Sequence, residues 1–321
     1  MSQACSLQSL EADEPLAGTA PVVSCYIIIE QPGPWGREAL LDSHLPRELG
    51  EQLLALTVGT QVKIVLARHP DRLERDAHVG NNIWIAHTAP GHRGMRHGIV
   101  EDLNALLDWD FTAIADGNLP PIGHIQRRPL TFVCTHGSRD ACCAVVGRSV
   151  YDELLASVPE DERTLVWEVS HLGGHRFAPT TLSLPSGSIH GRLDAADTIA
   201  MRAAASRGQV FLKGFRGRGS VPAPLQVACI AVRTEFNVID AEDLDVLRVV
   251  NDRAVPAPTS IVFLDDQMEA EVRHADGRCW RVNVQREQLP GMRAESCDKS
   301  PESIFAWTVR GVAQQVNNWH R

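Results

Sequence analysis

The sequence lacks the features that would assign it to a membrane or to a nucleic acid. Its 321 residues contain no apolar run of about 18 residues, the length that a membrane-spanning helix needs. Lysine and arginine number 31 against 40 acidic residues, which gives a formal net charge of -9 at pH 7. Nucleic acids and anionic membranes are bound through an excess of Lys and Arg, so we expect neither as a partner.

The N-terminus lacks the pattern of a targeting signal. Residues 1–19 contain no Lys or Arg and no apolar run, whereas a secretory signal has both and a transit peptide is rich in Arg. The same stretch carries the acidic residues Glu11, Asp13 and Glu14. We therefore expect a disordered leader over residues 1–19 and a cytosolic chain.

Cysteine is present, but not in the spacing of a dithiol enzyme. No two of the eight cysteines are arranged as Cys-x-x-Cys, so thioredoxin-type dithiol chemistry is disfavoured. Eight cysteines in a chain of this length also do not form a disulfide scaffold. Five are scattered, and we expect them to be core thiols: Cys5, Cys25, Cys229, Cys279 and Cys297. Cys134, Cys142 and Cys143 differ because they cluster.

The composition is that of a globular protein, with 44% hydrophobic and 22% charged residues. Alternating and helical apolar patterns follow one another along the chain, which predicts an α/β (α+β) fold. Beyond the leader we expect an αβ domain over 20–118, a second domain over 119–235 and a small α+β module over 236–321.

The order of elements in the second domain is β-α-β, then a β-hairpin, then a helix, which is the order of a thioredoxin-like fold. The segments are PLTFVCTH, ACCAVVGRSVYDELLASV, RTLVWEVSH, TTLSLPSGSIHGRL and DAADTIAMRAAASRG. In the last module, TSIVFLDD reads as a strand and MEAEVRHADGRCWRVNVQRE as a hairpin. SPESIFAWTVRGVAQQV begins with an approximate capping box, which favours a helix there.

Two strands of the second domain end in metal-binding residue types. One leads into Cys134 and the loop to Cys142 and Cys143, and the other leads into SHLGGHRF, with His171 and His175. The Gly-Gly pair between these histidines would weaken a helix by roughly 1 kcal/mol per glycine, so we expect a loop. Because neighbouring strand ends face the same rim of an αβ sheet, the sequence permits a site of two cysteines and two histidines.

Spacing alone leaves the nature of this site open. Zinc accepts two cysteines and two histidines, but its cysteines are usually two to four residues apart, and a wide cysteine loop suits a two-iron cluster better. A metal-free or zinc-bound binding module, and a thiol enzyme that uses Cys142 or Cys143 as its nucleophile, remain as alternatives. Two histidine ligands in place of two thiolates would raise the reduction potential of such a cluster, and their outer nitrogens could couple reduction to proton uptake.

The segments CTHGSRDACCA, EVSHLGGHRFAP and GFRGRGSVPAPLQVA resemble the sucrase/ferredoxin-like family of thioredoxin-like ferredoxins. This resemblance covers roughly residues 20–235 and implies a [2Fe-2S] cluster held by Cys134, Cys143, His171 and His175, with Cys142 as the alternative second cysteine. It implies an electron carrier rather than a catalyst with its own substrate, and a redox partner protein. The sequence gives no indication of the oligomeric state.

Two further features lie close to these motifs. We expect His136 to be an exposed loop histidine, with a supporting contact to the site or a ligand role as the alternatives. The glycine-rich GFRGRG at Gly214–Gly219 lacks the Lys-Ser/Thr of a phosphate-binding loop, and we expect it to pack beside the rim of the site.

Overall fold

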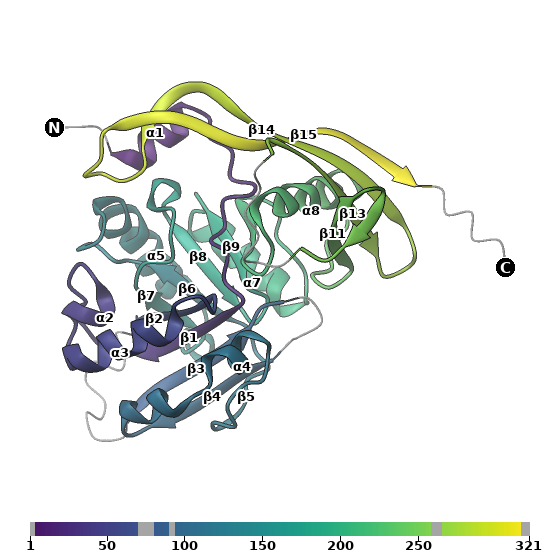
Figure 1. Ribbon diagram of the computed structural model, residues 1–321. Coiled ribbons are helices and arrows are strands. Elements are labelled where there is room, and N and C mark those ends of the chain that lie inside the picture. The colour runs from purple at the N-terminus through teal and green to yellow at the C-terminus, as the bar shows by residue number, and fades with distance from the viewer. Residues whose placement is uncertain (1–3, 70–79, 90–93, 258–264, 316–321) are drawn as a thin grey trace.

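The computed structural model describes residues 4–69, 80–89, 94–257 and 265–315, which form a large and a small β-sheet with helices around them (Figure 1). The large sheet has ten strands in the order β10-β9-β8-β6-β7-β2-β1-β3-β4-β5. Its strands are β1 (Cys25–Glu30), β2 (Val62–Arg68), β3 (Asn81–His87), β4 (Met95–Val100), β5 (His124–Ile125), β6 (Leu130–Cys134), β7 (Val166–Val169), β8 (Thr180–Leu184), β9 (Ser188–Gly191) and β10 (Phe215–Arg218).

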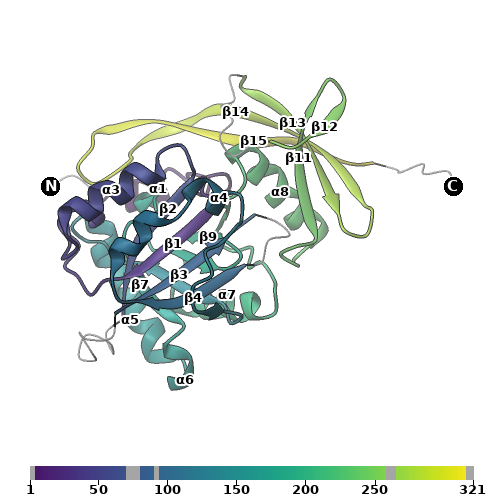
Figure 2. The same ribbon diagram turned by 60° about the horizontal axis from the view of Figure 1, so that its bottom comes forward.

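Helices cover the large sheet, and α8 lies between it and the small sheet (Figure 2). The helices are α1 (Cys5–Glu11), α2 (Ala39–Asp42), α3 (Arg47–Thr57), η2 (Leu103–Asp108), α4 (Phe111–Ala115), η3 (Cys143–Gly147), α5 (Arg148–Ser157), α6 (Glu160–Arg163), η4 (His175–Phe177), α7 (Ala195–Ser206) and α8 (Ala223–Phe236). Among the residues that the structure describes, no helix combines the length and apolar character needed to cross a membrane.

Strand β1 shows why the large sheet is covered on both faces. Its sequence CYIIIE is buried throughout, and side chains of a strand alternate between the two faces of the sheet. Tyr26 and Ile28 enter one hydrophobic core, whereas Ile27 and Ile29 enter another. A continuous apolar strand is therefore stable at this place because each face has its own core.

The large sheet consists of two halves with the same strand order. In the first half β1 pairs with β2 in parallel and with β3 in antiparallel orientation, and β3 pairs with β4. In the second half β6, β7, β8 and β9 repeat these pairings. The halves are joined by antiparallel pairing of β2 with β7, where Ala67 faces Val169. The sheet thus continues across the expected boundary between residues 118 and 119, and that boundary stays a prediction.

Local expectations for the second half agree with the structure. The hairpin of β8 and β9 turns at Pro185–Gly187, and α7 begins after Asp194, whose carboxylate accepts a 2.7 Å hydrogen bond from the backbone N–H of Asp197. This N-cap satisfies a backbone donor that the helix itself leaves without a partner. The mixed α/β class is confirmed, and the strand order β9-β8-β6-β7 follows from the expected sequence of elements.

The small sheet has the order β12-β11-β13-β14-β15. Its strands are β11 (Leu244–Val250), β12 (Arg253–Val255), β13 (Gln267–His274), β14 (Cys279–Ala294) and β15 (Pro301–Gln315). The hairpin expected around Ala275–Gly277 is confirmed, with Arg273 opposite Cys279. The helix expected from the approximate capping box is wrong: this segment is β15, which pairs with β14 along almost its whole length. Most of TSIVFLDD lies outside the described residues.

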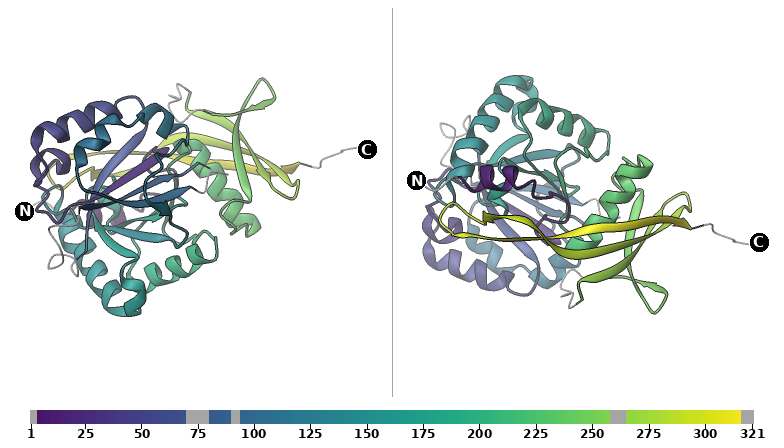
Figure 3. Two further views of the ribbon diagram at one scale, coloured as in Figure 1. Left: turned by 90° about the horizontal axis from the view of Figure 1, so that it is seen from below. Right: turned by 90° about the horizontal axis from the view of Figure 1, so that it is seen from above.

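Residues 5–19, where a disordered leader was expected, contain α1 and are held by the C-terminal hairpin. The long strands β14 and β15 extend away from the small sheet, and their connecting end lies over α1 (Figure 3, right). The side-chain oxygen of Gln8 accepts a 2.7 Å hydrogen bond from the backbone N–H of Ala294, and Glu14 forms a 3.0 Å ion pair with Arg293. Further long-range contacts come from the centre of the chain, where Arg176 pairs with Glu14 at 2.9 Å and Arg192 donates a hydrogen bond to Ser9. Contacts between residues this far apart in the sequence order the segment, so local composition did not reveal it.

Candidate metal centre

The last residue of β6 and the start of the following helix bring two thiols together. Cys134 is fully buried, and its Sγ lies 3.5 Å from the Sγ of Cys143, which is 1% exposed. The helix can approach the strand end this closely because Gly147 faces the carbonyl oxygen of Cys134, where a Cβ would come within 2.1 Å. Both cysteines belong to one hydrophobic core.

The neighbouring thiol of Cys142 points to a different set of residues. Its Sγ lies 3.4 Å from the Sγ of Cys5 and 3.3 Å from that of Cys297. Residues 143–147 form a wide helical turn of the π type, a feature that occurs often at functional sites. Of the two adjacent cysteines, the structure therefore places Cys143 beside Cys134.

His171 follows β7 and lies beside these thiols. One of its nitrogens lies within 4.8 Å of both sulfurs, those of Cys134 and Cys143. The ring of His175 is 5.0 Å from that of His171 between centroids, but His175 does not belong to this closer group. Donor atoms of Cys134, Cys143 and His171 are therefore close enough to one another to bind a single metal ion. The fourth expected ligand, His175, lies next to His171.

The buried ring nitrogens of these histidines lack hydrogen-bond partners among the described residues. They are Nδ1 of His171 and both Nδ1 and Nε2 of His175. The nearest carboxylate to His175 is that of Asp140, at 3.6 Å from Nε2. Burial lowers the pKa of His175, an effect that Asp140 opposes, so the ring is neutral at neutral pH. Since buried polar atoms are normally paired, these nitrogens fit the donor set of a metal centre.

The contact between the two thiols shifts their pKa values in opposite directions. The hydrogen bond between them is the largest cause that holds the pKa of Cys134 well below its usual value, with His171 acting in the same direction against burial. The same hydrogen bond, together with burial, raises the pKa of Cys143 well above its usual value. A thiolate is the metal-binding form of cysteine, so Cys134 is prepared to bind and Cys143 must lose its proton.

A buried arginine holds the loop between the histidines. The guanidinium of Arg216 donates a 2.9 Å hydrogen bond to the carbonyl oxygen of Gly173, and it is only 1% exposed. A Cβ at Gly174 would lie 2.3 Å from Nη2 of Arg216, and the φ of Gly174 is +73°. Glycine is therefore needed here for both backbone conformation and space. The expectation that GFRGRG packs beside the site is confirmed for Arg216.

His136 is buried, so its expected exposure is wrong. Its Nε2 lies 2.7 Å from the carbonyl oxygen of Gly36, and its Nδ1 accepts a 3.2 Å hydrogen bond from the backbone N–H of His171. Because Nδ1 accepts, Nε2 carries the proton and donates to Gly36. Both nitrogens are thus engaged, and His136 supports the loop rather than offering a ligand atom. The rings of Trp35 and His136 pack edge to face, with 5.7 Å between their centroids.

Lys63 is a basic residue near the site that sequence reasoning missed. It lies on β2, and its Nζ donates a 3.0 Å hydrogen bond to the carbonyl oxygen of Leu172, between the two histidines. Burial lowers the pKa of Lys63 to about 8, and the nearby Cys134 opposes this shift. Its position within an alternating strand gave no sign of this contact, because β2 reaches β7 only through the pairing of the two halves.

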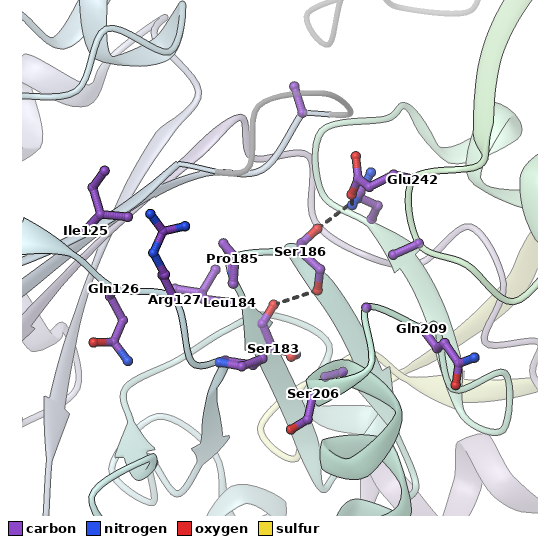
Figure 4. A pocket seen from close by; sticks show the side chains of 16 residues that line it. Ile125, Gln126, Arg127, Ser183, Leu184, Pro185, Ser186, Ser206, Gln209 and Glu242 are labelled. Atoms are coloured by element: carbon purple, nitrogen blue, oxygen red, sulfur yellow. Dashed lines mark hydrogen bonds and ion pairs between the residues drawn. The ribbon is translucent and has the colours of Figure 1, made fainter. Parts of the chain in front are cut away.

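A cavity beside the large sheet lies away from this centre. It has a volume of about 310 Å³ and is lined by residues such as Arg127, Ser183 and Ser186 (Figure 4). Leu184 in its wall faces Leu130, at the opposite end of β6 from Cys134. None of the expected ligands lines this cavity, so it does not serve the candidate metal centre.

Comparison with known proteins assigns the chain to a family. No curated protein and no solved structure gives a significant match. The family model described as sucrase/ferredoxin-like matches residues 16–217, which is more than half of the chain and includes all four expected ligands. The chain therefore belongs to the sucrase/ferredoxin-like family.

Proposed function

We propose that the protein is an electron carrier that holds a [2Fe-2S] cluster between Cys134, Cys143, His171 and His175. The observation that carries this proposal is the meeting of two buried thiols, 3.5 Å apart, with two histidines whose buried ring nitrogens lack hydrogen-bond partners. Family membership and the strand order β9-β8-β6-β7, which fits a thioredoxin-like ferredoxin domain, support it further.

The residues of the site have distinct tasks in this proposal. Cys134 and Cys143 lie on the core side and provide thiolates shielded from water. His171 is the most exposed of the four ligands, so it is the group through which a partner protein would approach and a proton could enter. When bound, the cluster supplies reversible one-electron transfer, with a potential above that of all-cysteine clusters.

The positive charges near the thiols bear on the same function. Lys63 and Arg216 both lie beside the loop of Leu172 and Gly173, where Arg216 is buried and Lys63 is partly buried. A fixed positive charge stabilises the more negative, reduced state of a site in a low-dielectric environment. These residues would therefore raise the potential further while they hold the histidine loop in place.

Elemental analysis of anaerobically purified protein tests the proposal. We expect about two irons and two acid-labile sulfides per chain, with a visible absorbance that bleaches on reduction. Cys143→Ser should lose both, whereas Cys229→Ser, on α8, should retain them. A colourless wild-type protein without iron would refute the proposal. Zinc without sulfide that disappears in Cys143→Ser would instead indicate a zinc-bound module at this site.

A further inference from the structure

Three cysteines that are far apart in the sequence converge beside the candidate metal centre. The Sγ atoms of Cys5, Cys142 and Cys297 form a triangle with sides of 3.4, 3.3 and 3.6 Å. Oδ1 of Asp140 lies 3.3 Å from the sulfur of Cys297 and 3.8 Å from that of Cys5. One atom from each of these four residues falls within 4.8 Å of all the others.

Each cysteine comes from a different part of the fold. Cys5 begins α1, Cys142 precedes the π-type turn, and Cys297 lies in the connection between β14 and β15. Asp140 fixes two of these segments, because its carboxylate accepts 2.9 Å hydrogen bonds from the backbone N–H groups of Cys142 and Cys297. These three cysteines and Asp140 therefore join α1, the segment that precedes η3 and the connection between β14 and β15. The end of the β14–β15 hairpin lies beside α1 (Figure 1).

Packing of core thiols does not account for this arrangement. The neighbouring apolar side chains are small, among them Ala178 and Ala294, and a 4% exposed carboxylate lies at the centre of the group. Buried carboxylates are normally paired with a cation or a metal ion. The contact of Asp140 with His175 is 3.6 Å long, and its other partners are amides and thiols.

The distances fit the coordination shell of one ion. A tetrahedral zinc with Zn–S bonds of about 2.3 Å holds neighbouring sulfurs about 3.8 Å apart, so the three sulfurs would move outward by only a few tenths of an ångström. Cysteines on different irons of an iron–sulfur cluster lie farther apart, because the irons separate them. All three thiols are free rather than joined as disulfides.

We propose that Cys5, Cys142 and Cys297, with a carboxylate oxygen of Asp140, bind a single thiophilic divalent cation of the zinc type. The ion fastens the end of the β14–β15 hairpin and the N-terminal helix to the loop that carries Cys143. Formation of the three metal–thiolate bonds releases the thiol protons to solvent, without any change in oxidation state. This site is separate from the iron–sulfur centre and does not depend on it.

Metal analysis of the full-length protein, expressed with zinc present, tests the proposal. We expect about one zinc per chain that survives gel filtration. Cys297→Ser should reduce zinc at least tenfold and leave iron and sulfide unchanged. Cys143→Ser should have the opposite effect, losing iron while retaining zinc. Cys229→Ser is the matched control and should retain both metals.

A second measurement avoids dependence on the stability of a variant. Wild-type protein stripped of zinc with a chelator and titrated with Co²⁺ should give the absorbance of tetrahedral thiolate-bound cobalt, saturating at about one ion per chain. Zinc-free wild-type protein that binds no Co²⁺ would refute the proposal, as would zinc that Cys297→Ser retains. Mass spectrometry that finds Cys142 and Cys297 joined as a disulfide in the purified protein would also overturn it.

Discussion

Nδ1 of His136 accepts a 3.2 Å hydrogen bond from the backbone N–H of His171, and this bond links the loop of the cysteines to the loop of the histidines. Residues that orient metal ligands without touching the metal commonly change affinity by about 10–100-fold when they are replaced. The contact therefore gives the first of four predictions.

His136→Leu should lower the iron and sulfide content per chain several-fold, because the loop of His171 loses its support and Gly36 loses a donor. His136→Asn should retain more of both, since its side-chain oxygen can replace Nδ1 as the acceptor. Iron and acid-labile sulfide assays on equal amounts of folded protein make the comparison. Equal contents in wild type and both variants would show that the bond is not needed for cofactor binding.

His175→Cys should retain the cluster and lower its reduction potential by on the order of 100 mV, because a thiolate adds negative charge where a neutral imidazole stood. Redox titration followed by visible absorbance measures the shift. His44→Cys, at an exposed position, is the control and should leave the potential unchanged. A potential unaffected by His175→Cys would remove His175 from the set of ligands.

Gly174→Ala should destabilise the protein more than Gly208→Ala. Both glycines have a φ of +73°, but a Cβ at Gly174 meets Arg216 at 2.3 Å whereas one at Gly208 meets open space. The backbone conformation costs about 1–2 kcal/mol in each variant. The contact with Arg216 should add about 1–3 kcal/mol at Gly174. Denaturant unfolding gives both values, and equal losses would mean that Arg216 moves aside freely.

His190 should make stability depend on pH. It lies on β9, is 1% exposed, and its Nε2 lies 2.8 Å from the carbonyl oxygen of Phe211. Burial lowers its pKa to about 4, with the charge of Arg216 acting in the same direction. Below the unfolded pKa of about 6.5 the unfolded chain therefore binds more protons. Stability is complete above that pH and decreases as the pH falls toward 4.

Between pH 7 and pH 5, His190 should lower the free energy of unfolding of the wild type by about 2 kcal/mol. His190→Gln retains a donor for Phe211 but does not titrate. The free energy of unfolding of this variant should therefore fall by about 2 kcal/mol less than that of the wild type over the same interval. His44→Gln, at an exposed position, should behave like wild type. Urea unfolding at both pH values measures the difference. A loss in His190→Gln as large as that of wild type would contradict the assignment.

Local sequence determined much of the fold, including the strands around the site, α7 with its Asp194 cap and the hairpin at Ala275–Gly277. These elements depend on the spacing of apolar residues, on capping residues and on turn residues, all within a few positions of one another. β15 was misassigned for the opposite reason. Its approximate capping box is a local signal, and long pairing with β14 outweighs it.

The sequence by itself brought Cys134, one of Cys142 and Cys143, and the two histidines His171 and His175 into one candidate site, because strand ends that face the same rim can be inferred from the order of elements. The choice of Cys143 came from the family resemblance. Only the tertiary structure decided what surrounds them. The β2–β7 pairing brings Lys63 to the loop of Leu172, and the C-terminal hairpin brings Cys297 to Cys5 and Cys142. Contacts between residues separated by hundreds of positions follow from packing and leave no periodic signal in the chain.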